Sequence, residues 1–138
     1  MQNAKRRGKA EPAGKARETR QGDLMEVKVI FHINEMDKWQ GLIQNAANLL
    51  VAYEGEEKTP IVEVLANGGA VGGYLLGARD IEGMKSLADQ GVVFAACNNA
   101  LKGQGIAADR LAPFVAVVPA GVRELADRQM EGYAYIKP

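Results

Sequence analysis

The sequence has only one cysteine, one histidine and one tryptophan among its 138 residues. A single cysteine excludes an internal disulfide framework, and one cysteine with one histidine cannot complete a closed zinc site. No carboxylate pair has the spacing of metal ligands, so we expect no bound metal. No apolar run is long enough to span a membrane, and the basic N-terminus lacks the apolar core of a signal peptide. We therefore expect a cytoplasmic protein without a membrane segment.

A complete nucleotide-binding motif is also missing. The glycine-rich segment at residues 67–77 suggests a phosphate-binding loop, but Tyr74 and Leu75 follow Gly73 where such a loop needs Lys and Ser or Thr. None of its glycines falls at the spacing of a dinucleotide-binding fingerprint. We expect a tight turn followed by close helix packing, and no cofactor.

Length and composition fit one globular domain, with 47% hydrophobic and 25% charged residues. The net charge is zero, but basic residues are concentrated in residues 1–24 and leave residues 25–138 mildly acidic. Because residues 1–24 have almost no large apolar side chain, we predict a disordered basic tail before an α/β domain at 25–138. Met25 is an alternative start of the chain. The tail has no interleaved aromatics or nucleic-acid-binding motif, so we favour a solvated segment and expect no nucleic-acid partner.

Apolar runs alternate with helical patterns from Met25 onward. Helical spacing of apolar residues predicts a long helix from Trp39 to Tyr53 capped by Asn34, and short helices at 70–76, from Ile81 and after Cys97. A last helix carries an apolar stripe of Val122, Leu125, Ala126 and Met130. Short apolar or β-branched runs predict five strands: Val27–Ile33, Ile61–Ala66, Val92–Ala96, Phe114–Val118 and Tyr133–Ile136.

This alternation predicts an α/β fold with a parallel five-stranded sheet between two layers of helices. The middle strands are apolar throughout, as expected for strands covered on both faces. We expect a three-layer α/β/α, flavodoxin-like arrangement with strand order 2-1-3-4-5.

Ligands in such sheets bind outside the carboxyl ends of the strands, where the strand order reverses. In the predicted order this point lies between strands one and three, which end at His32 and at Cys97. The turn that begins with Asn67 lies at the same edge. The candidate binding residues are therefore His32, Asn67, Gly68, Asn98 and Asn99.

Cys97 is the candidate catalytic residue because a helix follows it directly. Free backbone amides and the positive end of the helix dipole favour a thiolate at such a position, and the thiolate is the nucleophile. The alternative is a small buried hydrophobe. His32 either exchanges a proton with Cys97 or only bonds to the backbone, and strand alternation leaves open whether the two side chains share a face. No third residue is placed to orient His32.

Several segments resemble the DsrE/DsrF-like family. They are Phe31–Trp39, Phe94–Lys102, Gly105-Ile106, Val118–Val122 and Gln129–Pro138, and their order covers the chain from about Val27 onward. The chain is similar to the small stand-alone DsrE-type members. The resemblance implies a flavodoxin-like fold and homo-oligomers, commonly trimers or hexamers. In sulfur-relay members a cysteine at the position of Cys97 holds sulfur as a persulfide and passes it to an acceptor.

Two functions follow from these observations. The first is an intracellular sulfur-relay protein, a sulfur carrier or sulfurtransferase, which exchanges sulfur with donor and acceptor proteins through Cys97. The second is a non-catalytic, oligomeric binding or assembly protein in which Cys97 is a packing residue.

Overall fold

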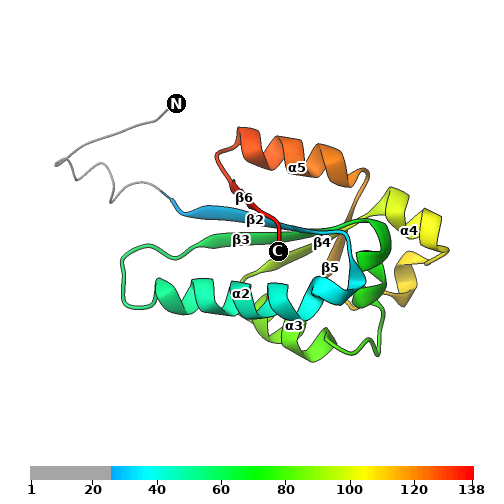
Figure 1. Cartoon of the computed structure of the whole chain (residues 1–138), viewed down its shortest axis with the longest axis horizontal. Coiled ribbons are helices and arrows are strands. Elements are labelled where there is room, and N and C mark those ends of the chain that lie inside the picture. The colour runs from blue at the N-terminus through cyan, green and yellow to red at the C-terminus, as the bar shows by residue number, and fades with distance from the viewer. Residues whose placement is uncertain (1–25) are drawn as a thin grey trace.

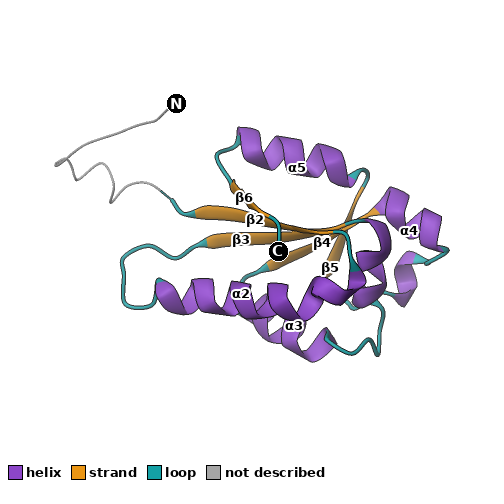
Figure 2. Ribbon diagram, viewed as in Figure 1, coloured by secondary structure: helices purple, strands orange, loops and turns teal. Residues whose placement is uncertain are grey.

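The computed structural model describes residues 26–138, so the predicted N-terminal tail and Met25 lie outside the described range. Strands and helices alternate along this range, as Figures 1 and 2 show. The strands are β2 (Lys28–Ile33), β3 (Ile61–Ala66), β4 (Val93–Cys97), β5 (Val115–Val118) and β6 (Ala134–Ile136). The α-helices are α2 (Trp39–Ala52), α3 (Ile81–Asp89), α4 (Asn98–Gln104) and α5 (Gly121–Met130), and the 3-10 helices are η1 (Met36–Lys38), η2 (Gly68–Tyr74) and η3 (Ala108–Arg110).

The five strands form one all-parallel sheet in the order β5-β4-β3-β2-β6. The predicted flavodoxin-like order 2-1-3-4-5 is therefore wrong, because the strands run 4-3-2-1-5 in chain order. Burial gives the reason: the five residues from Val62 to Ala66 are all buried, so β3 needs a neighbour on each side. The three residues of β6 are all exposed, which suits an edge.

Helices cover both faces of the sheet, with α2 and α3 on one face and α5 on the other (Figure 2). Alternation along the strands assigns the side chains. Phe31, Val64 and Phe94 pack with α2 and α3 in the larger core cluster. Ile30, Leu65, Ala95 and Leu125 form the smaller cluster beneath α5. The predicted three layers are present.

The glycine-rich segment forms η2, which packs closely on the start of α2. Trp39 is fully buried, and its indole nitrogen donates a hydrogen bond to the carbonyl oxygen of Ala70 at 2.9 Å. A Cβ atom on Gly73 would overlap that indole ring. Glycine is needed here for close packing, as the sequence led us to expect.

Two expected helix features differ from the structure. Asn34 does not cap α2: η1, whose N-cap is Glu35, precedes the helix, and Lys38 is the N-cap of α2. Neither N-cap residue makes a side-chain hydrogen bond. Most of the predicted apolar stripe of α5 does not face the sheet: Val122 and Met130 are 74% and 79% exposed, and Leu125 is its one buried residue. Gly121 and Leu125 are the residues of α5 that become buried.

Candidate functional site

Cys97 ends β4 and occupies the N-cap position of α4. Helix α4, which follows β4, contributes Leu101 to the larger cluster, whereas α5, which follows β5, packs on the opposite face. The connections therefore diverge between the carboxyl ends of β4 and β5, where Cys97 pairs with Val118. The predicted switch point between strands one and three is wrong, since β3 separates those strands. Cys97 nevertheless lies at the switch point that the structure has.

The Cys97 side chain lies beneath the start of α5. Its residue is 6% exposed, and alternation along β4 places the side chain on the same face as Ala95, which packs with Leu125. A Cβ atom on Gly121 would stand 3.1 Å from Cys97 Cβ and 3.1 Å from Leu65 Cδ1. Gly121 thus lets the turn between β5 and α5 lie directly over the thiol.

A row of polar side chains crosses this face of the sheet beside Cys97. His32 Nε2 lies 3.0 Å from Asn67 Oδ1, and His32 Nδ1 lies 2.6 Å from the hydroxyl oxygen of Tyr135. Asn67 Cβ is 3.5 Å from the place of a Gly121 Cβ, which puts Asn67 and Cys97 under the same residue of α5. His32 and Cys97 therefore share a face, which answers the question that the sequence left open. The structure brings together three of the predicted residues: His32, Asn67 and Cys97.

The sequence did not reveal Tyr135 as part of this row. Tyr135 pairs with Ile30 across β6 and β2, so it lies diagonally next to His32 on the same face. Lys137, two residues further on, donates a hydrogen bond to Asn34 Oδ1 at 3.3 Å. Only the position of β6 beside β2 brings these side chains together, and the predicted strand order placed the last strand elsewhere.

The other predicted residues border the row. Gly68 has a φ of +53°, and a Cβ there would lie 3.1 Å from the carbonyl oxygen of Asn34. The backbone conformation and the close contact therefore both favour glycine at this position. Asn98 and Asn99 form the first turn of α4, whose backbone amides lack partners within the helix. A binding role for these three residues stays a prediction.

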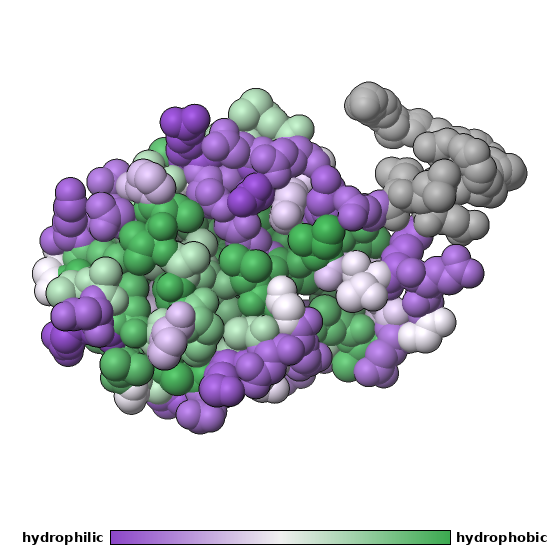
Figure 3. Space-filling model, turned by 180° about the vertical axis from the view of Figure 1, so that it is seen from behind, coloured by the Kyte–Doolittle hydropathy of each residue, from purple (hydrophilic) through white to green (hydrophobic). Residues whose placement is uncertain are grey.

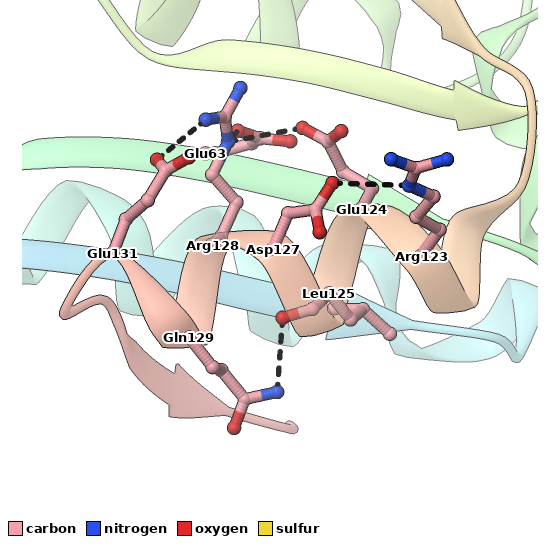
Figure 4. Close-up of polar contacts among 8 residues, drawn as sticks. All are labelled: Glu63, Arg123, Glu124, Leu125, Asp127, Arg128, Gln129 and Glu131. Atoms are coloured by element: carbon pink, nitrogen blue, oxygen red, sulfur yellow. Dashed lines mark hydrogen bonds and ion pairs between the residues drawn. The ribbon is translucent and has the colours of Figure 1, made fainter.

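A second polar group lies on the same face of the sheet at the opposite end of α5 (Figure 4). Glu63 is 4% exposed, and its Oε1 accepts a hydrogen bond from Arg128 Nε at 2.9 Å. The same nitrogen donates to Glu124 at 3.1 Å, and Arg128 Nη1 donates to Glu131 at 2.8 Å. Glu63 Oε2 is buried without a hydrogen-bond partner in the described structure.

Burial, reinforced by the neighbouring Glu124, raises the pKa of Glu63 from 4.5 to about 8. Arg128 opposes this rise, but one guanidinium cannot neutralise Glu63, Glu124 and Glu131 together. The hydrogen bonds to Glu131 and Glu63, together with the negative charges of Glu63 and Glu124, raise the pKa of Arg128 in turn, so Arg128 stays charged. The sequence signal for this group is the one acidic residue within the apolar run Ile61–Ala66.

Residues 26–138 contain no group of three or more His, Cys, Asp or Glu side chains that could hold a metal ion. None of the helices in this range is long and apolar enough to cross a bilayer.

These features define a class: a parallel α/β protein with a cysteine at a strand-to-helix junction of the sheet's carboxyl edge. The model of the DsrE/DsrF-like family matches residues 77–138, which include Cys97 and all of α5. The protein of unknown function MTH1491 from Methanobacterium thermoautotrophicum is 34% identical in sequence, with a TM-score of 0.75, over 82% of this chain and 100% of that one. The chain belongs to the DsrE/DsrF-like family, which is related to sulfur relays.

Two further solved structures share the fold at lower identity. The ychN protein from E. coli has a TM-score of 0.64 at 18% identity, over 83% of this chain and 100% of its own. The conserved protein of unknown function BT1422 from Bacteroides thetaiotaomicron has a TM-score of 0.59 at 16% identity, over 80% of this chain and 94% of its own. None of the curated proteins compared with this chain matches it.

Proposed function

We propose that this protein is a sulfur carrier that holds sulfane sulfur as a persulfide on Cys97. The observation that carries the proposal is the place of the thiol: Cys97 ends β4 at the switch point, within the segment that matches the family. Backbone amides at Asn98 and Asn99 begin α4 directly after it and supply donors for an anionic sulfur. Such a carrier works in a reducing compartment such as the cytoplasm, where a free thiol persists.

The proposed transfer is a two-electron displacement. The Cys97 thiolate attacks the outer sulfur of a donor persulfide R–S–SH, the donor S–S bond breaks, and R–S⁻ leaves. The new Cys97–S–SH loses its proton to water and remains as an anionic persulfide. An acceptor thiolate then attacks the outer sulfur and releases the Cys97 thiolate, so sulfur passes on without a net oxidant or reductant.

Intact mass spectrometry tests this proposal. The chain is incubated with a small persulfide donor under non-reducing conditions, and we expect an adduct of one sulfur atom that a thiol acceptor removes. Cys97→Ser is the matched control and should show no adduct. Absence of the adduct on the native chain, or an equal adduct on Cys97→Ser, would contradict sulfur carriage.

A second candidate function is non-catalytic assembly, and the exposed apolar surface favours it. The view from behind, on the side of β5, shows apolar residues across the middle of that face (Figure 3). Val93 and Val117 of β4 and β5 are 49% and 41% exposed, and no strand within residues 26–138 pairs with the outer edge of β5. We propose that this face, together with the outward side of α5, joins copies of the chain into a trimer or hexamer.

Assembly is compatible with sulfur carriage, so the two functions are separated by the thiol and not by the oligomer. The rate of Cys97 alkylation in the native protein is compared with the rate in denaturant. A carrier requires that the native thiol reacts, because the donor sulfur must reach it. Cys97 that reacts only after unfolding would leave assembly as the function.

A further inference from the structure

The hydrogen bonds of His32 determine which ring nitrogen carries the proton. Asn67 Oδ1, 3.0 Å from Nε2, is an amide oxygen and can only accept, so Nε2 must carry a hydrogen. In the neutral imidazole Nδ1 is then the acceptor, and the Tyr135 hydroxyl, 2.6 Å away, donates to it. Tyr135, His32 and Asn67 thus form a directed chain in which each hydroxyl or N–H group donates toward Asn67.

This chain fixes the side-chain amide of Asn67. The oxygen limb of the planar amide is held toward His32 on β2, and no hydrogen bond within residues 26–138 occupies the nitrogen limb. Asn67 follows β3, which lies between β2 and β4, so Cys97 lies on the side away from His32. Asn67 Cβ and Cys97 Cβ both border Gly121. The two N–H donors of Asn67 have no partner among the described residues and are therefore left for a group beside Cys97.

We propose that Asn67 binds the outer, anionic sulfur of a Cys97 persulfide through its side-chain N–H groups, and that His32 and Tyr135 are positioning residues that keep this amide in place. The inference rests on the proposed sulfur carriage and adds the group that recognises the carried sulfur. Hydrogen bonds from a neutral donor to an anion are stronger than neutral ones and favour the anionic form. The row thus stabilises the anionic persulfide.

The orientation of Asn67 is tested without any sulfur. Because the chain has a single histidine, long-range proton–nitrogen correlation spectra contain the signals of one imidazole only. We expect the neutral ring to be protonated at Nε2. Protonation at Nδ1 would mean that Nε2 accepts a hydrogen bond from the amide nitrogen, which would turn the oxygen of Asn67 toward Cys97 and overturn the proposal.

The role of Tyr135 is tested with a matched pair of tyrosines from the same C-terminal segment. Tyr135→Phe removes the donor to Nδ1, and we expect the single-histidine spectrum to show a mixture of tautomers. Lys28 and Arg128 lie over the ring of Tyr133, and no hydrogen bond within residues 26–138 joins its hydroxyl to the row, so Tyr133→Phe should leave the tautomer unchanged. An unchanged tautomer in Tyr135→Phe would remove Tyr135 from the chain of donors.

The binding of sulfur is tested by the equilibrium between a small persulfide donor and Cys97. We expect Asn67→Ala to lower the equilibrium constant for loading Cys97 with sulfur about tenfold, the usual effect of losing one hydrogen bond to a charged group. His32→Leu should cause a similar but smaller loss, and His32→Gln should restore part of it, because its amide can still donate to Asn67 Oδ1. The folded state of each variant is checked by the fluorescence of the single tryptophan, Trp39.

The outcomes separate this inference from the proposed function. If the native chain and the Asn67→Ala variant take up sulfur equally well, the binding role of Asn67 is contradicted and sulfur carriage stands. A native chain that takes up no sulfur contradicts sulfur carriage and, with it, the binding role. In that case the tautomer experiment still decides whether Tyr135 and His32 orient Asn67.

Discussion

Glu63 places an ionisable group in the interior of the sheet, and its energetics follow from the groups around it. Glu124 and Arg128 face it from α5, and Glu131, directly after α5, binds the same Arg128; Tyr74 from η2 lies across the sheet. Two largely buried carboxylates share the one Arg128 Nε–H group, so retaining a proton on Glu63 costs less than burying a second negative charge.

Stability should therefore fall as the pH rises through the neutral range. The pKa of Glu63 is 4.5 before folding and about 8 in the folded state. Below about pH 4.5 Glu63 is protonated in both states; between about pH 4.5 and about pH 8 only the folded state keeps the proton. We expect the free energy of unfolding to decrease by roughly 1–3 kcal/mol across this interval and then to level off. Denaturant titrations at several pH values measure it.

Glu63→Gln should flatten this pH dependence, because its neutral amide keeps an oxygen for Arg128 without an ionisable group. Glu131→Gln is the matched control: it removes a carboxylate from the same Arg128, but its side chain is 52% exposed. An equal slope in the native chain and Glu63→Gln would show that Glu63 does not retain the proton.

Gly121 should control access to the thiol. A Cβ at this position meets Cys97 Cβ and Leu65 Cδ1 at 3.1 Å, so Gly121→Ala has to move the start of α5 or the thiol. We expect a loss of about 1 kcal/mol in stability and a change in the rate at which Cys97 is alkylated. Gly103→Ala serves as a control, since no atom lies within 4 Å of the added carbon. Equal alkylation rates in all three proteins would argue against a covering role for Gly121.

At this scale the sequence predicted three of the side chains that meet, His32, Asn67 and Cys97, because all follow or end strands of one parallel sheet. Such residues share an edge whatever the strand order is, so the wrong order did not remove them. Tyr135 required the neighbour of β2 to be known, and that is a long-range contact that no local pattern encodes. Glu63 is visible in the sequence as an acidic residue in an apolar run, but its partners could not be predicted. They lie on or next to a helix that begins about 60 positions later, beyond the reach of any local pattern.

At the scale of elements, close packing between η2 and α2 replaces the ligand binding that a glycine-rich segment suggests. Trp39, Tyr74 and Phe94 form an aromatic group, with ring centroids of Trp39 and Tyr74 5.1 Å apart. Gly73 allows η2 to lie against the indole of Trp39, so its glycine serves backbone approach and not phosphate contact.

Gly73→Ala should consequently destabilise the fold strongly. The added carbon overlaps the indole ring, and Trp39 is fully buried with no room to move aside. We expect a loss of at least about 2 kcal/mol, measured by denaturant unfolding with Trp39 fluorescence. Gly69→Ala is the matched control in the same segment, because no atom lies within 4 Å of its added carbon. A stable Gly73→Ala chain with unchanged fluorescence would contradict this packing.

Helix α5 shows where periodicity alone misleads. Its apolar residues Val122, Leu125, Ala126 and Met130 predict one buried stripe, but only Leu125 is buried and the other three are exposed. The helix instead turns Gly121 and Leu125 toward the sheet, together with the charged Arg128 that pairs with Glu63. The sequence of such a helix allows either its apolar side or its charged side to pack on the sheet. Here Glu63 on the neighbouring strand determines that the side with Arg128 faces inward.

At the scale of the whole molecule, the two faces of the sheet are covered unequally. Helices α2 and α3 and the aromatic group fill one face, whereas α5 alone covers the other and leaves Val93 of that face 49% exposed. Apolar residues also reach the surface across the middle of the view from behind (Figure 3). The sequence predicted the α/β class and the all-parallel sheet from the alternation of elements. It could not give the order of the strands, because burial of β3 on both sides becomes visible only once its neighbours are known.

Charging the β5 edge should dissociate the proposed trimer or hexamer. Val117→Lys places an ammonium group on the apolar edge strand, where it disfavours pairing with a second copy. We expect native mass spectrometry to show a smaller species than the native chain forms. Val51→Lys, a change at a 62% exposed valine of α2, is the control and should leave the assembly unchanged. Dissociation by Val51→Lys alone would place the interface on the other face.

The row at the carboxyl edge joins residues that are far apart in the chain: Tyr135 and His32 are separated by 103 positions. A ribosome makes the chain from its N-terminus, so Cys97 and α4 emerge well before β6. The nascent protein therefore displays its thiol for some time without the hydroxyl that orients the imidazole. Oxidants that react with Cys97 during synthesis, or metal ions that bind it, would therefore act on a chain in which Tyr135 does not yet contact His32.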